Sequence, residues 1–333
     1  MSEAKMTANG AVTTEDAKPW SMTRVVTASS AGTAFEWYDF FIFGSLTPVI
    51  AKVFLAGLDP TGALVAALAL FAVGFAFRPL GAIIFGAMGD RVGRKPVMLG
   101  GMLLALLLYF PGSHLIAEAA NPALVAAQER TPVVVETDPA TCSSQFDPTG
   151  TAKFTSACDI AKSTLIARGV AYDTRPSSDG QTRVHAGQQA VPISGGESAE
   201  DLKAHKVDIA TAVNAALEAA AYPEAADPAS IDYPLLLAVL LLFVVAATAL
   251  YGPQAAALVE MFPTRIRYTA MSLPYHVGTG WVGGFLPVTS FAIVAMTGEI
   301  YAGLWYAVAF TAISAMVTIF FLKETHGKPL GEC

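Results

Sequence analysis

Residues 78–110 read RPLGAIIFGAMGDRVGRKPVMLGGMLLALLLYF. Two apolar runs flank a short loop, GDRVGRK, which holds every charge of this stretch except Arg78. Extended outward along the chain, each run reaches the length that a membrane span needs, about 20 residues. The glycines of the loop allow the chain to reverse tightly. The stretch therefore predicts a helical hairpin in a membrane, with its charged loop at the membrane surface.

The composition of the whole chain is that of a membrane protein. Of its 333 residues, 54% are hydrophobic and 14% are charged, against about 25% charged in an ordinary soluble domain. The mean hydropathy is +0.51. Residues 118–232 differ from the rest, because they hold 16 acidic and 8 basic residues, a net charge of −8. This composition excludes a disordered chain, a collagen and an ordinary cytosolic enzyme, and the overall charge of −7 does not favour nucleic-acid binding.

Six segments are long and apolar enough to be membrane spans, so we predict an all-α integral membrane protein with about six transmembrane helices. The spans are residues 28–54, 62–88, 96–116, 234–259, 269–296 and 301–322. The short loops on one side hold nearly all of the basic residues, which places that side and both termini in the cytoplasm. The predicted organisation is a cytoplasmic tail at 1–27, spans within 28–116, an extracytoplasmic insert at 117–232, spans within 233–322 and a second cytoplasmic tail at 323–333.

The acidic insert is predicted to be a small α-rich domain. One helix starts at Ser198, which can cap it, and continues with apolar residues at helical spacing. A second short helix is expected at about 156–168, and residues 174–189 between the two favour a loop or a hairpin. Cys142 and Cys158 are candidates for a disulfide in an oxidising compartment, and two free thiols are the alternative.

Charged and titratable side chains within spans are the clearest functional signal, because each is costly in lipid unless it is paired or solvated. Glu36 and Asp39 lie three residues apart, on one face of the first span, and Arg78 lies in the second. We interpret them as a proton-carrying carboxylate site with an arginine that binds an anionic group; a static ion pair is the alternative. His276 could relay protons or be a hydrogen-bonded structural histidine.

The loop between the second and third spans is a candidate gate, because its charges can hold helix ends together in one conformation and release them in another. The alternative is that its basic residues only keep this loop on the cytoplasmic side, as a positive-inside signal. The candidate residues are Gly89, Asp90, Arg91, Gly93 and Arg94. A comparable loop joins the fourth and fifth spans and predicts a second charge cluster, made of Glu260, Arg265 and Arg267.

These motifs resemble those of the major facilitator superfamily. GDRVGRK is similar to its signature loop, and FEWYDFFIFG, FRPLGAIIFGAMGDRVGRK, YGPQAAALVEMFPTRIRYT and SLPYHVGTGWVGGFLP resemble its metabolite:proton symporters. That branch carries dicarboxylates, shikimate, proline and betaine. The family has twelve spans in two halves, each with one signature loop. This chain resembles spans one and two joined to spans nine to twelve at the repeated loop, with an insertion between spans nine and ten.

The resemblance implies a shortened, proton-coupled symporter of a small carboxylate or zwitterion in the bacterial inner membrane. The implied partners are the solute, protons and lipid, and two chains in a homodimer would restore about twelve spans. The alternatives are a non-transporting product of gene rearrangement and a membrane-anchored extracytoplasmic binding domain. The sequence holds no P-loop, GxSxG or HExxH motif, so we expect no enzyme activity, cofactor or metal site.

Overall fold

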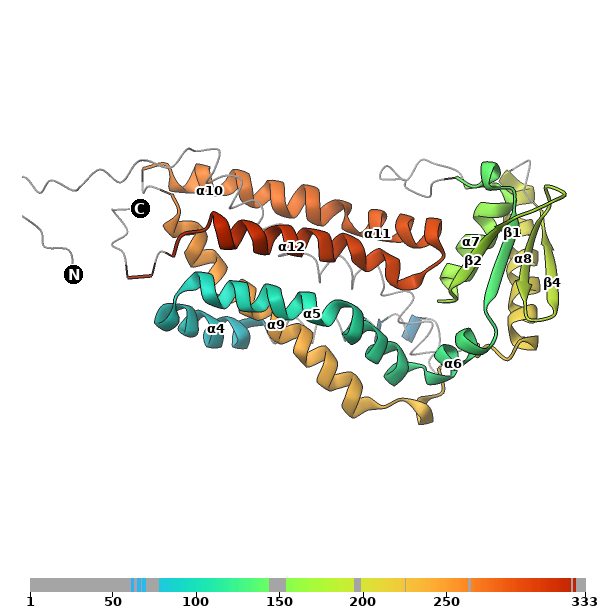
Figure 1. Ribbon diagram of the computed structural model, residues 1–333, viewed down its shortest axis with the longest axis horizontal. Helices are drawn as coiled ribbons and strands as arrows, with labels where there is room; N and C mark the ends of the chain where they lie inside the picture. The colour runs from blue at the N-terminus through green and yellow to red at the C-terminus, as the bar shows by residue number, and fades with distance from the viewer. Residues whose placement is uncertain are drawn as a thin grey trace, which may run out of the picture.

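The computed structural model describes two parts of the chain, an elongated helical bundle and a mixed α/β insert at one end of it (Figure 1). The described residues are 61–62, 65–66, 68–69, 78–143, 154–194, 199–224, 226–262, 265–324 and 326–327. The predicted first span at 28–54 lies outside them, as do Glu36 and Asp39. All structural statements below concern the described residues.

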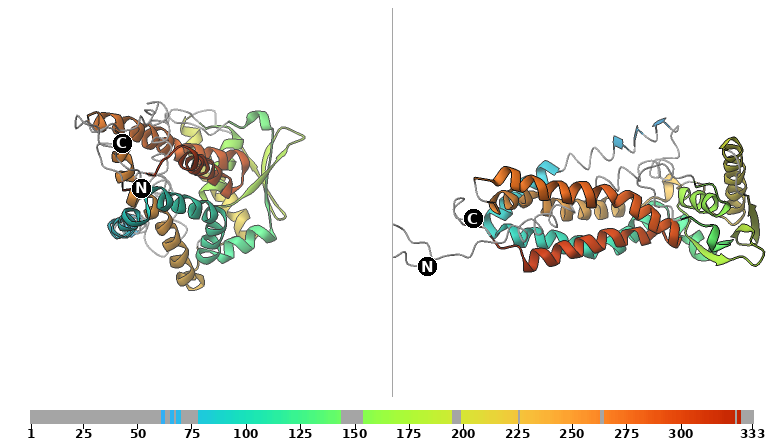
Figure 2. Two further views of the ribbon diagram at one scale, coloured as in Figure 1. Left: turned by 60° about the vertical axis from the view of Figure 1, so that its left-hand side comes forward. Right: turned by 90° about the horizontal axis from the view of Figure 1, so that it is seen from above.

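The bundle has the helical hairpin that the opening stretch predicts, followed by helices from the second half of the chain. Its elements are α4 (Arg78–Val92), α5 (Arg94–Ala120), α9 (Tyr233–Glu260), α10 (Arg267–His276), α11 (Gly284–Thr297) and α12 (Leu304–Phe320). α5 lies along both α9 and α12, and α4 lies along α9 (Figures 1 and 2). The helix ends at the α4–α5 junction and after α12 lie at the end of the bundle opposite the insert.

Glycine allows the close approach of α5 and α9. A Cβ atom added to Gly101 would lie 2.7 Å from the carbonyl oxygen of Ala246, whereas one added to Gly100 would meet no atom within 4 Å. Lipid provides no hydrophobic drive between helices, so association there depends on such close packing. The shared core of the bundle is formed by Met98, Met102, Ala105, Tyr109, Ala246, Leu250, Ala257, Leu286, Ala307, Ala315 and Leu322.

A π-helical turn, Val277–Gly283, joins α10 to α11. The wider turn changes the backbone hydrogen-bond pattern, so some of its groups need other partners. The hydroxyl group of Tyr306 on α12 donates a hydrogen bond of 2.8 Å to the carbonyl oxygen of Val282. This bond ties α12 to the irregular turn and satisfies an acceptor in it.

Four helical segments among the described residues are long and apolar enough to cross a membrane: Arg94–Ala120, Tyr233–Glu260, Arg267–Thr297 and Ile300–Phe320. They confirm the last four predicted spans, with ends that differ by a few residues. Of the span predicted at 62–88, residues 78–88 are described continuously. They belong to α4, a helix of 15 residues that continues to Val92. The 3-10 turn η4 (Ile300–Gly303) directly precedes α12 and lengthens the last span at its N-terminal end.

The insert is built on a four-stranded sheet with the strand order β2-β1-β3-β4. β1 pairs in parallel with β2 across a connection that contains α7, and antiparallel with β3, which forms a hairpin with β4. Two helices, α7 and α8, pack against the sheet. The elements are α6 (Pro122–Arg130), β1 (Val133–Thr137), η1 (Pro139–Thr141), α7 (Ala157–Ala167), β2 (Tyr172–Pro176), β3 (Thr182–Ala186), β4 (Gln189–Ile193), α8 (Ala199–Ala219) and η2 (Pro228–Ser230).

The prediction of an α-rich insert agrees with the helices α6, α7 and α8, but it missed this sheet. Each strand has only five residues, and short apolar runs such as β1 cannot be assigned to strand or helix from their pattern alone. β2 shows no alternation, since four of its five residues are exposed. The two helices predicted there are confirmed, and of the loop or hairpin expected between them, the hairpin β3–β4 is present. Ser156 caps α7 by accepting a hydrogen bond from the Asp159 N–H, and Gly169 follows the helix with a φ of 67°.

Candidate functional site: a charge cluster at one end of the bundle

Arg94 is the centre of a charge cluster at the α4–α5 junction. Its Nη2 lies 2.8 Å from a carboxylate oxygen of Glu260, at the end of α9, and 3.2 Å from one of Asp90, at the end of α4. The side chains of Arg94 and Glu260 are 15% and 13% exposed, whereas that of Asp90 is 70% exposed. The Arg94–Glu260 pair is therefore the largely desolvated contact, and it joins three helix ends.

Glu324, which follows α12, caps the N-terminus of α5. Its two carboxylate oxygens accept hydrogen bonds from the backbone N–H groups of Arg94 (3.1 Å) and Lys95 (2.9 Å). Helix N-termini leave such donors without intrahelical partners and attract negative charge. Gly93 makes the approach possible, because its φ is 112° and an added Cβ would lie 2.5 Å from Oε2 of Glu324. A residue 230 positions away thus does what an N-cap side chain would otherwise do.

Two further contacts close the same junction. The Lys95 ammonium donates a hydrogen bond of 2.8 Å to the carbonyl oxygen of Ile319 near the end of α12. The His326 ring donates through Nε2 to the carbonyl oxygen of Asp90, at 2.7 Å. We name this set the loop cluster; its members are Asp90, Gly93, Arg94, Lys95, Glu260, Glu324 and His326.

The predicted gating residues do not form two separate clusters in the structure. The two predicted clusters meet in one, since Glu260 from the second loop pairs with Arg94 of the first. Arg91 and Arg265 are exposed and lie outside this cluster. Arg267 donates from Nε to the carbonyl oxygen of Phe262, at 2.9 Å, and so binds the end of its own loop. Gly89 is buried and serves packing, because an added Cβ would lie 3.0 Å from the ring of Pro253.

The predicted substrate and proton site is described only in part. The guanidinium carbon of Arg78, at the start of α4, lies 4.7 Å from the centre of the Tyr251 ring on α9. His276 is exposed at the end of α10, directly before the π-helical turn, with its ring 5.5 Å from that of Tyr275. Arg78 thus packs against α9, whereas His276 belongs to α10, and the carboxylates predicted as partners of Arg78 lie outside the described residues.

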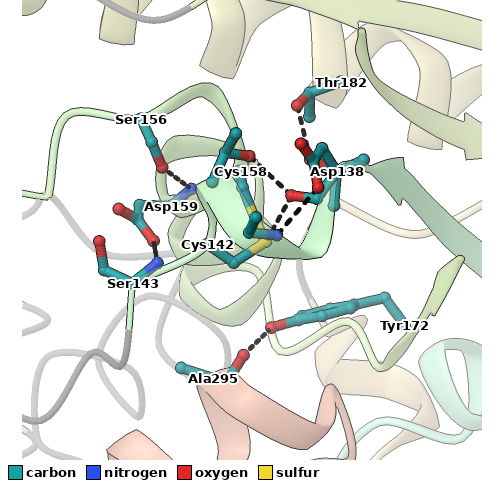
Figure 3. Close-up of a disulfide and its surroundings, with 12 residues drawn as sticks. Asp138, Cys142, Ser143, Ser156, Cys158, Asp159, Tyr172, Thr182 and Ala295 are labelled. Atoms are coloured by element: carbon teal, nitrogen blue, oxygen red, sulfur yellow. Dashed lines mark hydrogen bonds between the residues drawn. A yellow bond between two sulfur atoms is a disulfide. The ribbon is translucent and has the colours of Figure 1, made fainter. Parts of the chain in front are cut away.

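The insert contains the predicted cysteine pair as a disulfide between Cys142 and Cys158 (Figure 3). Asp159, the residue after Cys158, is buried and accepts a hydrogen bond of 2.9 Å from the backbone N–H of Ser143, the residue after Cys142. The disulfide and this bond hold the same two segments together. No group of three or more His, Cys, Asp or Glu residues that could hold a metal ion occurs in the part of the chain that the structure describes.

Burial and charge perturb titratable groups in the insert. Burial lowers the pKa of Lys162 on α7, and the neighbouring Asp159 carboxylate opposes that shift. Burial also raises the pKa of Tyr222 to about 12. The pKa of the exposed Asp179 is lowered, because it accepts hydrogen bonds from Arg183 and Ser177. These groups form no convergent catalytic set.

Comparisons with known proteins show that part of the chain is similar to transporters. Residues 209–333 match the family described as Sugar (and other) transporter. The matched part includes Glu260 and Glu324 of the loop cluster, together with the last three of the four described spans. The protein is a multi-pass membrane protein.

The chain is also similar to curated transporters over short stretches. It is 45% identical over 75 residues to the proline/betaine transporter of Escherichia coli K12, which covers 22% of this chain and 15% of that protein. It is 43% identical over 77 residues to the shikimate transporter of the same strain (23% and 18%), and 40% identical over 84 residues to its inner membrane metabolite transport protein YhjE (25% and 19%). The matches thus span less than a fifth of each relative. No solved structure matches.

Sequence reasoning missed Glu324 and His326, which complete the loop cluster. The only local signal was a carboxylate one residue beyond the last apolar run, in LKETHG. The basic residues of this tail were noticed as a topological signal, whereas the acidic one was not. Its role becomes visible only when the end of α12 is placed beside the start of α5.

Proposed function

We propose that the chain is a shortened membrane transporter of small organic solutes, and that the loop cluster closes one end of its helical bundle. The observation that carries the proposal is the largely buried contact between Arg94 and Glu260. Glu260 lies within residues 209–333, the part that matches the transporter family. The printed names of the relatives, which cover proline, betaine and shikimate, suggest a carboxylate or zwitterion as the solute.

The cluster acts as a gate because its contacts join separate helices. Leaving one partner of a largely buried charge pair alone costs about 3–5 kcal/mol. Separation of α5 from α9 would break the Arg94–Glu260 pair, and movement of the end of α12 would uncap α5. The closed arrangement is therefore favoured until water or another charge reaches these groups, which is the requirement for a gate that opens at one face.

Proton coupling is assigned to Glu36 and Asp39, with Arg78 as the anion-binding partner and His276 as a candidate relay. A carboxylate in a low-dielectric site can shift its pKa into the working range, whereas an amide of the same shape cannot titrate. Asp39→Asn should therefore abolish proton-driven accumulation more than it weakens solute binding. Unchanged accumulation in both Asp39→Asn and Glu36→Gln would make these acids structural.

The proposed orientation places the loop cluster in the cytoplasm of a bacterium and the insert outside its inner membrane, with both termini inside. The bias of basic residues and the disulfide of the insert both support it. A membrane-impermeant maleimide added to intact cells should leave Cys333 unlabelled and label Cys142 only after reduction. Labelling of Cys333 without labelling of reduced Cys142 would reverse the orientation.

Transport is tested by uptake of labelled proline, betaine and shikimate into proteoliposomes, with and without an inward proton gradient. We expect uptake above that of protein-free vesicles, altered rates for Glu260→Gln and unaltered rates for Glu299→Gln. Glu299 is a suitable control because it is exposed and lies between α11 and η4, next to Gly298, which contacts the insert. The absence of uptake for all three solutes would contradict the proposal for this solute class.

A homodimer is part of the proposal, because two chains would supply about twelve spans and would cover faces that a single chain leaves open. Native mass measurement in lipid nanodiscs should then give twice the chain mass, and a monomer with full uptake would exclude the dimer. The second candidate function is a membrane-anchored binding domain. The hydrophobic core of the insert, separate from that of the bundle, favours it if transport is absent.

A further inference from the structure

The insert is attached to the bundle by a contact far from its chain connections. Tyr172, the first residue of β2, donates its backbone N–H to the carbonyl oxygen of Gly298 at 3.0 Å. Its hydroxyl group donates to the carbonyl oxygen of Ala295 at 2.8 Å (Figure 3). Both acceptors lie at the end of α11, so a single residue of the insert binds the end of a membrane span.

The backbone at the end of α11 is shaped to accept Tyr172. The last carbonyl groups of a helix have no partner within it, and Tyr172 supplies donors to two of them at the end of α11. Gly298 has a φ of 78°, and an added Cβ would overlap the carbonyl oxygen of Tyr172. Tyr172 itself is only 4% exposed. The end of α11 and the start of β2 therefore fit each other as a docked pair.

The residues behind Tyr172 connect it to the disulfide. The ammonium group of Lys162, on α7, lies 5.9 Å from the centre of the Tyr172 ring. Asp159, one turn earlier on the same helix, interacts electrostatically with Lys162 and is held by the Ser143 N–H. Cys158 precedes Asp159 and is fully buried. The disulfide thus fixes the start of the helix that supports Tyr172.

We propose that the Cys142–Cys158 disulfide controls a latch between the insert and the end of α11, so that reduction of the disulfide releases Tyr172 from Ala295 and Gly298. The reductant is a dithiol. Its thiolate attacks the sulfur of Cys142, which is partly exposed, and Cys158 leaves as the thiolate. The second thiol of the reductant then displaces Cys142. Two electrons and two protons pass to the protein, which gains two thiols, while the reductant becomes a disulfide.

Reduction acts on the latch through the position of α7. Without the disulfide, the two segments lose their covalent link but keep the Ser143–Asp159 hydrogen bond, and α7 gains freedom at its first turn. The Lys162 ammonium group is then no longer held beside the Tyr172 ring. The sheet itself need not open, because β1 and β3 pair independently of both cysteines. The inference does not depend on transport.

Hydrogen exchange of the full chain in nanodiscs tests the latch. The Tyr172 amide reports on docking, and the Val184 amide in the sheet reports on global opening of the insert. We expect dithiol treatment, confirmed by a mass gain of two hydrogens (about 2 Da), to accelerate exchange at Tyr172 about tenfold and to leave Val184 unchanged. Unchanged exchange at Tyr172, or equal acceleration at both amides, would overturn the proposal.

Two variants separate the disulfide from the latch. Tyr172→Phe removes the bond to Ala295 but keeps the disulfide, and it should also accelerate exchange at the Tyr172 position. Its matched control is Tyr222→Phe, because the Tyr222 hydroxyl bonds to the carbonyl oxygen of Thr131 inside the insert. In the double variant C142S/C158S, the dithiol should have no further effect. Equal effects of the two tyrosine variants at residue 172, or a remaining effect of the dithiol in the double variant, would contradict the latch.

Discussion

Replacement of Glu324 tests whether the end of the chain holds the start of α5. Its carboxylate accepts hydrogen bonds from the backbone N–H groups of Arg94 and Lys95. The residue before the helix, Gly93, has no side chain that could take over this role. We therefore expect Glu324→Ala to loosen the first turn of α5 and to leave the centre of the helix unchanged.

The magnitude follows from the two interactions that are lost. Removing a capping side chain costs about 0.5–2 kcal/mol, and removing a negative charge from a helix N-terminus costs a further 0.3–1 kcal/mol, roughly. Together the two ranges give about 0.8–3 kcal/mol. Both groups are only part-buried here, so we take a total in the lower half of this range, about 1.5 kcal/mol. Since 1.4 kcal/mol corresponds to a factor of about ten in an equilibrium constant, the first-turn amides should exchange roughly tenfold faster.

The assay is amide hydrogen exchange of the protein in nanodiscs, read at Arg94 and Lys95. Glu324→Gln should fall between the wild type and Glu324→Ala, because the amide keeps one acceptor oxygen but loses the charge. Gly93→Ala should resemble Glu324→Ala, since a Cβ there would displace the carboxylate and strain a φ of 112°. The matched control is Gly100→Ala on the same helix, where an added Cβ meets no atom within 4 Å.

Unchanged exchange at Arg94 and Lys95 in Glu324→Ala would refute the capping argument. Equal acceleration of exchange by Gly93→Ala and Gly100→Ala would also refute it, because the effect would then come from any substitution of glycine in this region. Acceleration throughout α5 would show that the whole helix, rather than its first turn, depends on Glu324.

Three further predictions concern packing and titration. Lys162→Met should remove a pH dependence of insert stability: burial lowers the folded-state pKa of Lys162, so stability rises with pH from that value to the unfolded value of about 10.4, and chemical unfolding at several pH values measures the slope. Gly101→Val should lower the unfolding midpoint of the bundle in detergent, whereas Gly100→Val should leave it nearly unchanged, because only the first position faces Ala246. Tyr306→Phe should cost about 1–3 kcal/mol by leaving the Val282 carbonyl oxygen without its donor, again read from the unfolding midpoint.

Some contacts of the loop cluster could be predicted from the sequence, and others could not. Asp90 and Arg94 are four residues apart in the chain, so their proximity across the α4–α5 junction follows from the short loop. Glu260 and Arg94 were each recognised as gating candidates, but their pairing needed the positions of α5 and α9. Glu324 was missed, because nothing near it in the sequence indicates that the start of a distant helix lacks a cap.

The insert shows the same division. Its helices were predicted, because Ser156 and Gly169 mark the start and end of α7 within the segment itself. Its sheet was not, because strands of five residues carry little periodic signal and their pairing joins segments that are far apart. The disulfide partners were named from their place in the polar segment, but the link from Cys158 through α7 to Tyr172 depends on packing.

The sequence by itself determined the last four membrane spans, to within a few residues at their ends. A span must satisfy its backbone hydrogen bonds internally and present about 20 apolar residues to lipid, so its signal is contained within one continuous segment. Only the tertiary structure decided that Glu324 caps α5, that Glu260 joins the first loop and that Tyr172 binds the end of α11. In each of these contacts, a charge or a backbone group of one segment is paired with a group from a distant segment. The sequence of one segment alone does not indicate which distant group will pair with it.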